Sequence, residues 1–132
     1  MRKILLTATL ITILATTAFA AAYKDITSTQ ARSLMGKGSS VFLLDVRTPE
    51  EYQKAHLEGA VLIPVSQLEN RLNEIPKKKR ILVYCAVGSR SGAAARILAG
   101  KGYSEVYNIA DGIMGWYRNG FPISHDKTPS AG

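Results

Sequence analysis

The chain has a single cysteine, and this scarcity restricts what its one thiol can do. Within the 132 residues, Cys85 has no partner for an internal disulfide. Without a second cysteine there is also no C-x-x-C motif of a thioredoxin-like oxidoreductase. The thiol is therefore buried and inert, paired with another chain, or reactive. Composition alone favours the inert thiol, so the residues around Cys85 must decide.

Other features are also missing from the sequence. It has no internal repeat, no low-complexity segment and no basic stripe interleaved with aromatic residues, so nucleic acid is not an expected partner. The one cluster of charge is the basic run at 77–80, which we interpret as a solvated turn before a strand rather than as a binding patch. No metal site and no cofactor are expected.

The first twenty residues have the pattern of a secretory signal peptide. Arg2 and Lys3 precede an apolar run, and Ala18-Phe19-Ala20 supplies the small-x-small cleavage pattern. The run is short for a membrane anchor, which needs about 20 apolar residues. We therefore predict a cleaved signal at 1–20, export to the periplasm and no stable membrane insertion afterwards.

The remaining 112 residues suit one compact domain. Loss of Arg2 and Lys3 lowers the net charge from +7 to +5, which favours small anionic molecules nearby. The sequence sets no oligomeric state.

Short apolar runs alternate with amphipathic segments along this domain. The pattern predicts strands at 23–26, 41–46, 60–65, 80–85 and 105–109, and helices at 28–38, 48–55, 66–75, 91–102 and 112–120. Capping boxes are expected at Thr48 with Glu51 and at Ser66 with Glu69. The alternation predicts an α/β fold, with helices around a central, mostly parallel sheet of about five strands. Ligands of such sheets lie at the carboxyl ends of the strands, where Cys85 is placed.

The residues after Cys85 are suited to holding an anion. Ala86, Gly88 and Ser89 are small enough for the loop to curl, so that successive backbone N–H groups point at one spot. Gly88 can take a positive φ, and a helix beginning near Ser91 adds unpaired donors. These donors favour a thiolate over a thiol, so we expect the pKa of Cys85 to be low without a histidine base.

Three motifs in order resemble the single-domain rhodaneses. Residues 85–91, Cys-Ala-Val-Gly-Ser-Arg-Ser, resemble the active-site loop of that family, and 43–64 resemble its N-terminal signature except that Glu58 replaces a proline. Residues 111–116 resemble its end signature, with Asp111 in place of a glycine. The resemblance covers residues 36–125. It leaves 21–35 as a lead-in, 36–126 as the rhodanese-like domain and 127–132 as a flexible tail.

The resemblance implies a sulfurtransferase. In this family Cys85 would take a sulfane sulfur from thiosulfate or a similar small anionic donor, hold it as a persulfide, and pass it to a thiol or to cyanide. No cofactor is implied. The donor-binding residues implied by the loop are Ala86, Val87, Gly88, Ser89, Arg90 and Ser91.

Two other functions remain open. The first is a phosphatase or arsenate reductase. Dual-specificity cell-cycle phosphatases, which resemble rhodaneses in fold, place five residues between cysteine and arginine, whereas four separate Cys85 from Arg90, a tighter cradle suited to one sulfur. The second alternative is a sulfur-carrying or binding module that serves a partner protein and does not turn over free donor.

Several further polar or aromatic residues are interpreted as structural. Asp45 and Arg47 are expected to form an ion pair or hydrogen-bond network that ties loops together, and His56 to be architectural. Arg90 is expected either to contact the donor or to hold loop carbonyls. The remaining expectations concern the C-terminal part: Trp116 and Tyr117 pack the last helix on the sheet, and His125 is solvated.

Overall fold

The sheet is entirely parallel and has five strands. The computed structural model describes residues 13, 22–36 and 40–126. The strands are β1 (Lys24–Ile26), β2 (Val41–Asp45), β3 (Val61–Leu62), β4 (Arg80–Tyr84) and β5 (Val106–Ile109). Their order is β1-β5-β4-β2-β3, with every neighbouring pair parallel. The predicted α/β class and strand number are confirmed.

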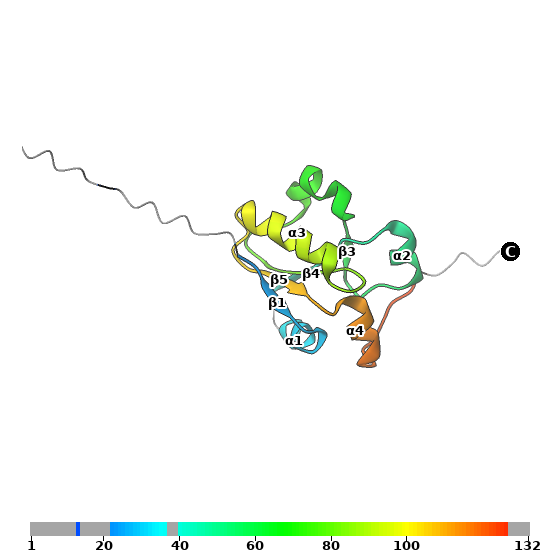
Figure 1. Ribbon diagram of the computed structural model, residues 1–132. Helices are drawn as coiled ribbons and strands as arrows, with labels where there is room; N and C mark the ends of the chain where they lie inside the picture. Colours follow the sequence, from blue (N-terminus) through cyan, green and yellow to red (C-terminus); the bar gives the residue numbers. More distant parts are fainter. Residues whose placement is uncertain (1–12, 14–21, 37–39, 127–132) are drawn as a thin grey trace, which may run out of the picture.

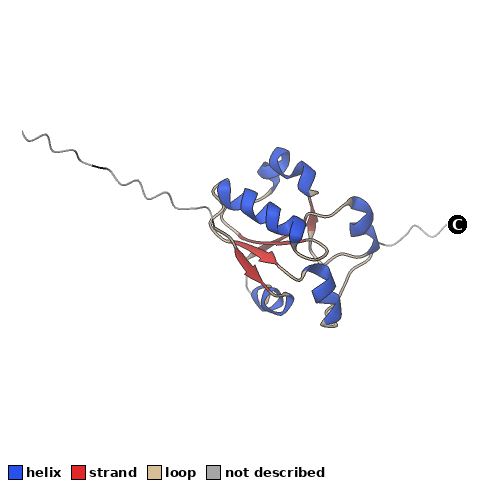
Figure 2. Cartoon of the chain, viewed as in Figure 1, coloured by secondary structure: helices blue, strands red, loops and turns tan. Residues whose placement is uncertain are grey.

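Helices cover both faces of this sheet. They are α1 (Ser28–Leu34), α2 (Pro49–Lys54), the 3-10 helix η1 (Val65–Glu74), α3 (Ser89–Gly100) and α4 (Gly112–Arg118). In Figure 1, α3 and the green 3-10 segment lie on one side of the sheet, and α1 and α4 lie on the other. Figure 2 shows the red strands as the middle layer between blue helices. Among the described residues, no helix combines the length and apolar character needed to cross a bilayer.

The central strand β4 has buried side chains on both faces of the sheet, which explains its continuous apolar sequence. Side chains alternate between the faces, so Ile81 and Val83 pack under α3 while Leu82 and Tyr84 pack against α1 and α4. All four are fully buried. Burial of each such side chain contributes about 1.5–3 kcal/mol. β4 is thus a strand buried on both faces. Cys85 follows its last residue and lies at the carboxyl end of the sheet.

The N-terminal lead-in contributes an edge strand and a helix to this domain. β1 pairs with β5, and Ser28 at the start of α1 donates from its N–H and hydroxyl to the carboxylate of Asp111, at 2.8 and 2.7 Å. Asp111 is one of the two departures from the rhodanese motifs. Its side chain joins α1 to α4, which a glycine at this position could not do. The predicted signal 1–20, apart from Ile13, and the tail 127–132 lie outside the described residues.

Two predicted helix starts have different outcomes. The Thr48 capping box forms as predicted, with Glu51 as its partner. The second box is wrong: the segment starts at Val65 as a 3-10 helix, with Pro64 as N-cap and no side-chain cap bond. Backbone bonds fix this start instead, because the Val65 N–H donates to Val46 O and draws the chain along β2. β3 is shorter than the predicted 60–65, because the chain turns into the 3-10 helix at Val65.

Candidate active site

Cys85 lies where the central strand meets the longest helix. The predicted loop is shorter than expected, because α3 begins at Ser89 rather than near Ser91. Ser89, Arg90 and Ser91 therefore form the first turn of α3, and the loop proper is 85–88. Gly88 is the N-cap residue. The unpaired N–H groups of the first helical turn thus start directly beside the thiol.

Gly88 has a conformation that requires glycine. Its φ is +97°, and a Cβ built there would lie 2.1 Å from the carbonyl oxygen of Ala110. The close approach aims the Gly88 N–H at Cys85, with 3.2 Å between its nitrogen and Sγ. The predicted positive φ at this residue is confirmed.

The start of α4 holds the same loop from behind. The N–H groups of Ile113 and Met114 donate to the carbonyl oxygens of Cys85 and Ala86, at 3.0 and 3.2 Å. Gly112 makes this approach possible, because a Cβ there would lie 2.2 Å from Ala86 O. These bonds turn the loop carbonyls away from the sulfur and leave its N–H groups on the inside.

Hydrogen bonds around Cys85 determine its ionisation. Burial opposes the thiolate, but the Ser91 hydroxyl and the backbone N–H groups of Ser91, Val87 and Gly88 all favour it, and together they lower the pKa of Cys85. The Ser91 oxygen lies 3.3 Å from Sγ. No histidine is among these donors. This is the anion-binding arrangement predicted from the small-residue loop.

The sulfur is nevertheless enclosed. Cys85 is 0% exposed and belongs to the apolar cluster beneath α3, whereas Val87 at the tip of the loop is 63% exposed. Burial alone would suit the inert thiol. An inert thiol among apolar side chains would have a raised pKa, however, and hydrogen bonds from the Gly88 N–H and the Ser91 hydroxyl are not needed to bury a neutral thiol. The arrangement favours a reactive thiolate.

Arg90 is bound to Glu51 rather than to the loop carbonyls that were one of its two predicted partners, and its contact with the donor stays a prediction. Its two terminal nitrogens lie 2.7 and 2.9 Å from the two carboxylate oxygens of Glu51 on α2, a bidentate pair. Hydrogen bonds from Arg90 lower the pKa of Glu51 to about 2. The pair joins the first turn of α3 to the first turn of α2.

Glu51→Gln should lower the free energy of unfolding by about 0.5–1 kcal/mol at pH 7, since the half-exposed pair is partly screened. Glutamine can still complete the capping box with Thr48, so the variant removes the charge and one of the two acceptors of the Arg90 pair. The folded-state pKa of Glu51 is depressed, so its contribution is complete above about pH 4.5 and disappears as pH falls towards 2.

Urea unfolding of wild type and Glu51→Gln from pH 7 to pH 2 measures this contribution. The two proteins should converge in acid. The exposed neighbour Glu50→Gln is the control and should match wild type within about 0.5 kcal/mol. A Glu51→Gln difference that persists unchanged at pH 2 would show that the ion pair is not its cause.

The predicted ion pair of Asp45 and Arg47 is confirmed. The Arg47 guanidinium donates to both oxygens of the fully buried Asp45 carboxylate, at 2.7–3.1 Å, and to Ala55 O after α2. Tyr84 completes the arrangement by accepting the N–H of Leu57 at 3.1 Å. These bonds tie the ends of β2 and β4 to the chain after α2.

His56 also has the predicted architectural place. Its ring stacks on Tyr52 with centroids 3.8 Å apart, and Nδ1 lies 2.8 Å from Tyr52 O. Its backbone exchanges two hydrogen bonds with Ser124. The His56 backbone therefore joins the chain after α2 to the C-terminal segment, and its ring packs on Tyr52 away from the cysteine loop.

The C-terminal expectations divide. Trp116 is buried in the cluster between α4 and the sheet, as predicted. Tyr117 is 68% exposed, so its predicted packing is wrong. Successive helix residues point about 100° apart, and Trp116 takes the inward direction. His125 is exposed, as predicted, and its ring contacts Lys54 O.

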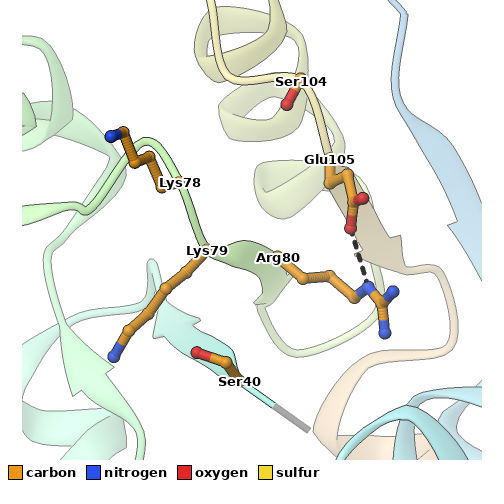
Figure 3. Close-up of a pocket in the computed structure, with 6 residues that line it drawn as sticks. All are labelled: Ser40, Lys78, Lys79, Arg80, Ser104 and Glu105. Carbon is orange, nitrogen blue, oxygen red and sulfur yellow. Dashed lines mark hydrogen bonds and ion pairs between the residues drawn. The ribbon is translucent and has the colours of Figure 1, made fainter.

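The basic run lies at the opposite end of the sheet from Cys85. Lys77, Lys78 and Lys79 are exposed in a turn that leads into β4, as predicted. Figure 3 shows Lys78 and Lys79 pointing apart, while Arg80 pairs with Glu105 at 2.9 Å. Diverging ammonium groups do not converge on one anion, so this surface is separate from the sulfur chemistry.

Fold and loop together define the class: a parallel α/β domain whose single cysteine lies in a backbone cradle at the carboxyl end of the central strand. Comparison with known proteins identifies the family. The Rhodanese-like domain family model matches residues 27–119. The chain belongs to the rhodanese-like domain family, and its relatives include sulfurtransferases.

Two curated relatives and one solved structure illustrate the likeness. A sulfurtransferase of Allochromatium vinosum is 34% identical over 99 residues, which are 75% of this chain and 92% of the relative. The thiosulfate sulfurtransferase PspE of Escherichia coli is 42% identical over 67 residues, covering 49% of this chain and 64% of PspE. The crystal structure of a rhodanese-related protein of Thermoplasma volcanium superposes with a TM-score of 0.70 at 28% identity, covering 77% and 98% of the two chains.

Proposed function

We propose that the protein is a sulfurtransferase that moves a sulfane sulfur from thiosulfate, or a similar small anion, through a Cys85 persulfide to a thiol or cyanide. The observation that carries the proposal is the pair of hydrogen bonds to Sγ, from the Gly88 N–H at 3.2 Å and from the Ser91 hydroxyl at 3.3 Å. The relative PspE, named for thiosulfate, supports this choice of donor.

The reaction consists of two displacements. The Cys85 thiolate attacks the outer sulfur of thiosulfate, a new S–S bond forms, and the electron pair of the broken S–S bond leaves with sulfite. The acceptor thiolate or cyanide then attacks the terminal sulfur, and the pair returns to Cys85 as a thiolate. Both steps balance without an external oxidant or reductant. This is nucleophilic catalysis with a covalent intermediate.

The cradle suits the intermediate as well as the nucleophile. A persulfide places its negative charge on the outer sulfur, one bond further from β4. The N–H groups of the loop can donate to the sulfur at that position as well. Because Sγ is enclosed, the donor has to reach it past the exposed loop tip at Val87, and a small opening of residues 86–87 is part of the proposed mechanism.

We also propose that this chemistry takes place in the periplasm. Support comes from the basic Arg2 and Lys3, the apolar run and the Ala18-Phe19-Ala20 pattern. Intact mass of protein recovered from the exported fraction tests it. We expect the mass of a chain whose first residue is at or near Ala21. An uncut chain found in the cytoplasm would contradict export.

Intact mass and turnover together test the function. After incubation with thiosulfate, the protein should gain the mass of one sulfur atom and lose it on addition of cyanide, with thiocyanate produced over many cycles. A gain of sulfur only from a partner protein, without turnover of free thiosulfate, would identify a carrier module. Hydrolysis of p-nitrophenyl phosphate without sulfur uptake would identify the phosphatase alternative.

A further inference from the structure

A buried amide lies directly behind the cysteine cradle. Asn108 on β5 is 4% exposed and faces the α3 side of the sheet. Its Nδ2 donates to Gly88 O at 3.2 Å and to the Asp25 carboxylate of β1 at 2.9 Å. Gly88 is the residue whose N–H bonds to Sγ. A chain of contacts therefore runs from the edge strand through Asn108 to the cradle.

Two hydrogen bonds fix the orientation of the Asn108 amide, and this orientation leaves a buried oxygen unpaired. Both neighbours of Nδ2 are acceptors, so the amide nitrogen has to point at them. Its Oδ1 is left buried with no hydrogen-bond partner in the described part of the chain. A leucine of similar size would avoid an unpaired buried oxygen, and such an exception calls for an explanation. The donor function of Nδ2 supplies one.

We infer that Asn108 is a positioning residue. By holding the Gly88 carbonyl it fixes the backbone of Gly88, so that the N–H of the same residue stays directed at the Cys85 sulfur. The carbonyl also accepts the Gly92 N–H at 3.0 Å, so it is held from two directions. Gly88 has no side chain to fix its backbone, and glycine has the widest choice of φ and ψ. Without Asn108, its peptide could rotate and withdraw the donor from the sulfur. Its importance for sulfur transfer rests on the proposed function.

The effect of the Asn108 tether on the thiolate has to be distinguished from the effects of nearby charged and titratable groups. Asp25 accepts from its amide, and Tyr23 and Arg96 line the same hollow beside Gly88. Arg90 interacts electrostatically with Cys85. A change of charge at any of these could also alter the thiolate. The test therefore needs a variant that changes charge and keeps the tether.

The experiment measures iodoacetamide alkylation of the only cysteine against pH, in wild type and three variants. Asn108→Leu removes the tether, and alkylation at pH 7 should slow about three- to tenfold with the profile shifted to higher pH, which one lost donor can produce. Asp25→Asn keeps an acceptor oxygen for Asn108 and should match wild type. Tyr103→Phe deletes a buried hydroxyl bonded to Leu72 O and Ile75 O, so it loses stability away from the loop and should also keep the wild-type profile.

An Asn108→Leu profile identical to wild type would overturn the inference, as would an equal shift in Asp25→Asn or Tyr103→Phe. Asn108→Ala gives the same readout if leucine is not accommodated. Alkylation needs no sulfur donor, so a wild-type protein without transferase activity would refute the proposed function and leave this test intact. Where transfer occurs, it should fall in Asn108→Leu by a factor similar to the fall in alkylation.

Discussion

Cys85→Ser should lower sulfur transfer by at least about four orders of magnitude, the scale on which loss of a nucleophile acts. A neutral hydroxyl in the same cradle is a far weaker nucleophile than a thiolate, and its oxygen cannot carry a persulfide. The cradle itself should survive, because the Ser91 hydroxyl and the Gly88 N–H can donate to a serine oxygen. Steady-state thiocyanate formation and intact mass after thiosulfate treatment measure the effect.

The control for this variant is its stability. Serine is nearly isosteric with cysteine, so the free energy of unfolding should change by only about 1 kcal/mol. Sulfur uptake by Cys85→Ser would contradict the mechanism outright, since the 132-residue chain has no other thiol. Residual turnover within tenfold of wild type would place the chemistry on another group.

Gly88→Ala should destabilise the protein by about 2–4 kcal/mol and remove most transfer activity. Two physical effects add. Alanine is strained at a φ of +97°, and its Cβ would lie 2.1 Å from Ala110 O, so the loop or the end of β5 has to move. Either movement draws the Gly88 N–H away from Sγ. Urea unfolding and thiocyanate formation measure the two consequences.

Gly120→Ala is the matched control. Gly120 also has a positive φ, +69°, but a Cβ there would meet nothing within 4 Å. Its replacement should cost only the strain, about 1–2 kcal/mol, and leave transfer at the wild-type rate. If Gly88→Ala costs no more than Gly120→Ala and keeps its activity, the close approach to Ala110 is not what shapes the site.

The strands could be predicted because both faces of the sheet are buried. β2 and β4 are near-continuous apolar runs, and the structure places them within a residue of the predicted ends. β3 and the 3-10 helix were less predictable. Backbone bonds from Ile63 and Val65 to the carbonyl oxygens of Asp45 and Val46 fix the turn after β3, which local capping patterns do not reveal.

The centre of the site could be predicted from seven consecutive residues. Small residues after a buried strand indicate a backbone cradle, and Gly88 and Ser91 lie where that argument needs them. The residues that hold the cradle were missed. Glu51 showed only its capping pattern, and Asn108 resembles any polar residue in a strand. Both act through contacts across 20 or more residues, so no local pattern carries the signal.

The central claim is that backbone N–H groups and Ser91, not a histidine, make Cys85 a thiolate. The pH dependence of Cys85 alkylation in wild type and His56→Ala tests it most directly. The His56 ring stacks on Tyr52 and bonds to its carbonyl oxygen, so its removal should reduce stability and leave the thiolate formed. Both proteins should show a midpoint below the free-cysteine value of roughly 8.5. A wild-type midpoint at or above that value, or a low midpoint that rises to it only in His56→Ala, would contradict the account.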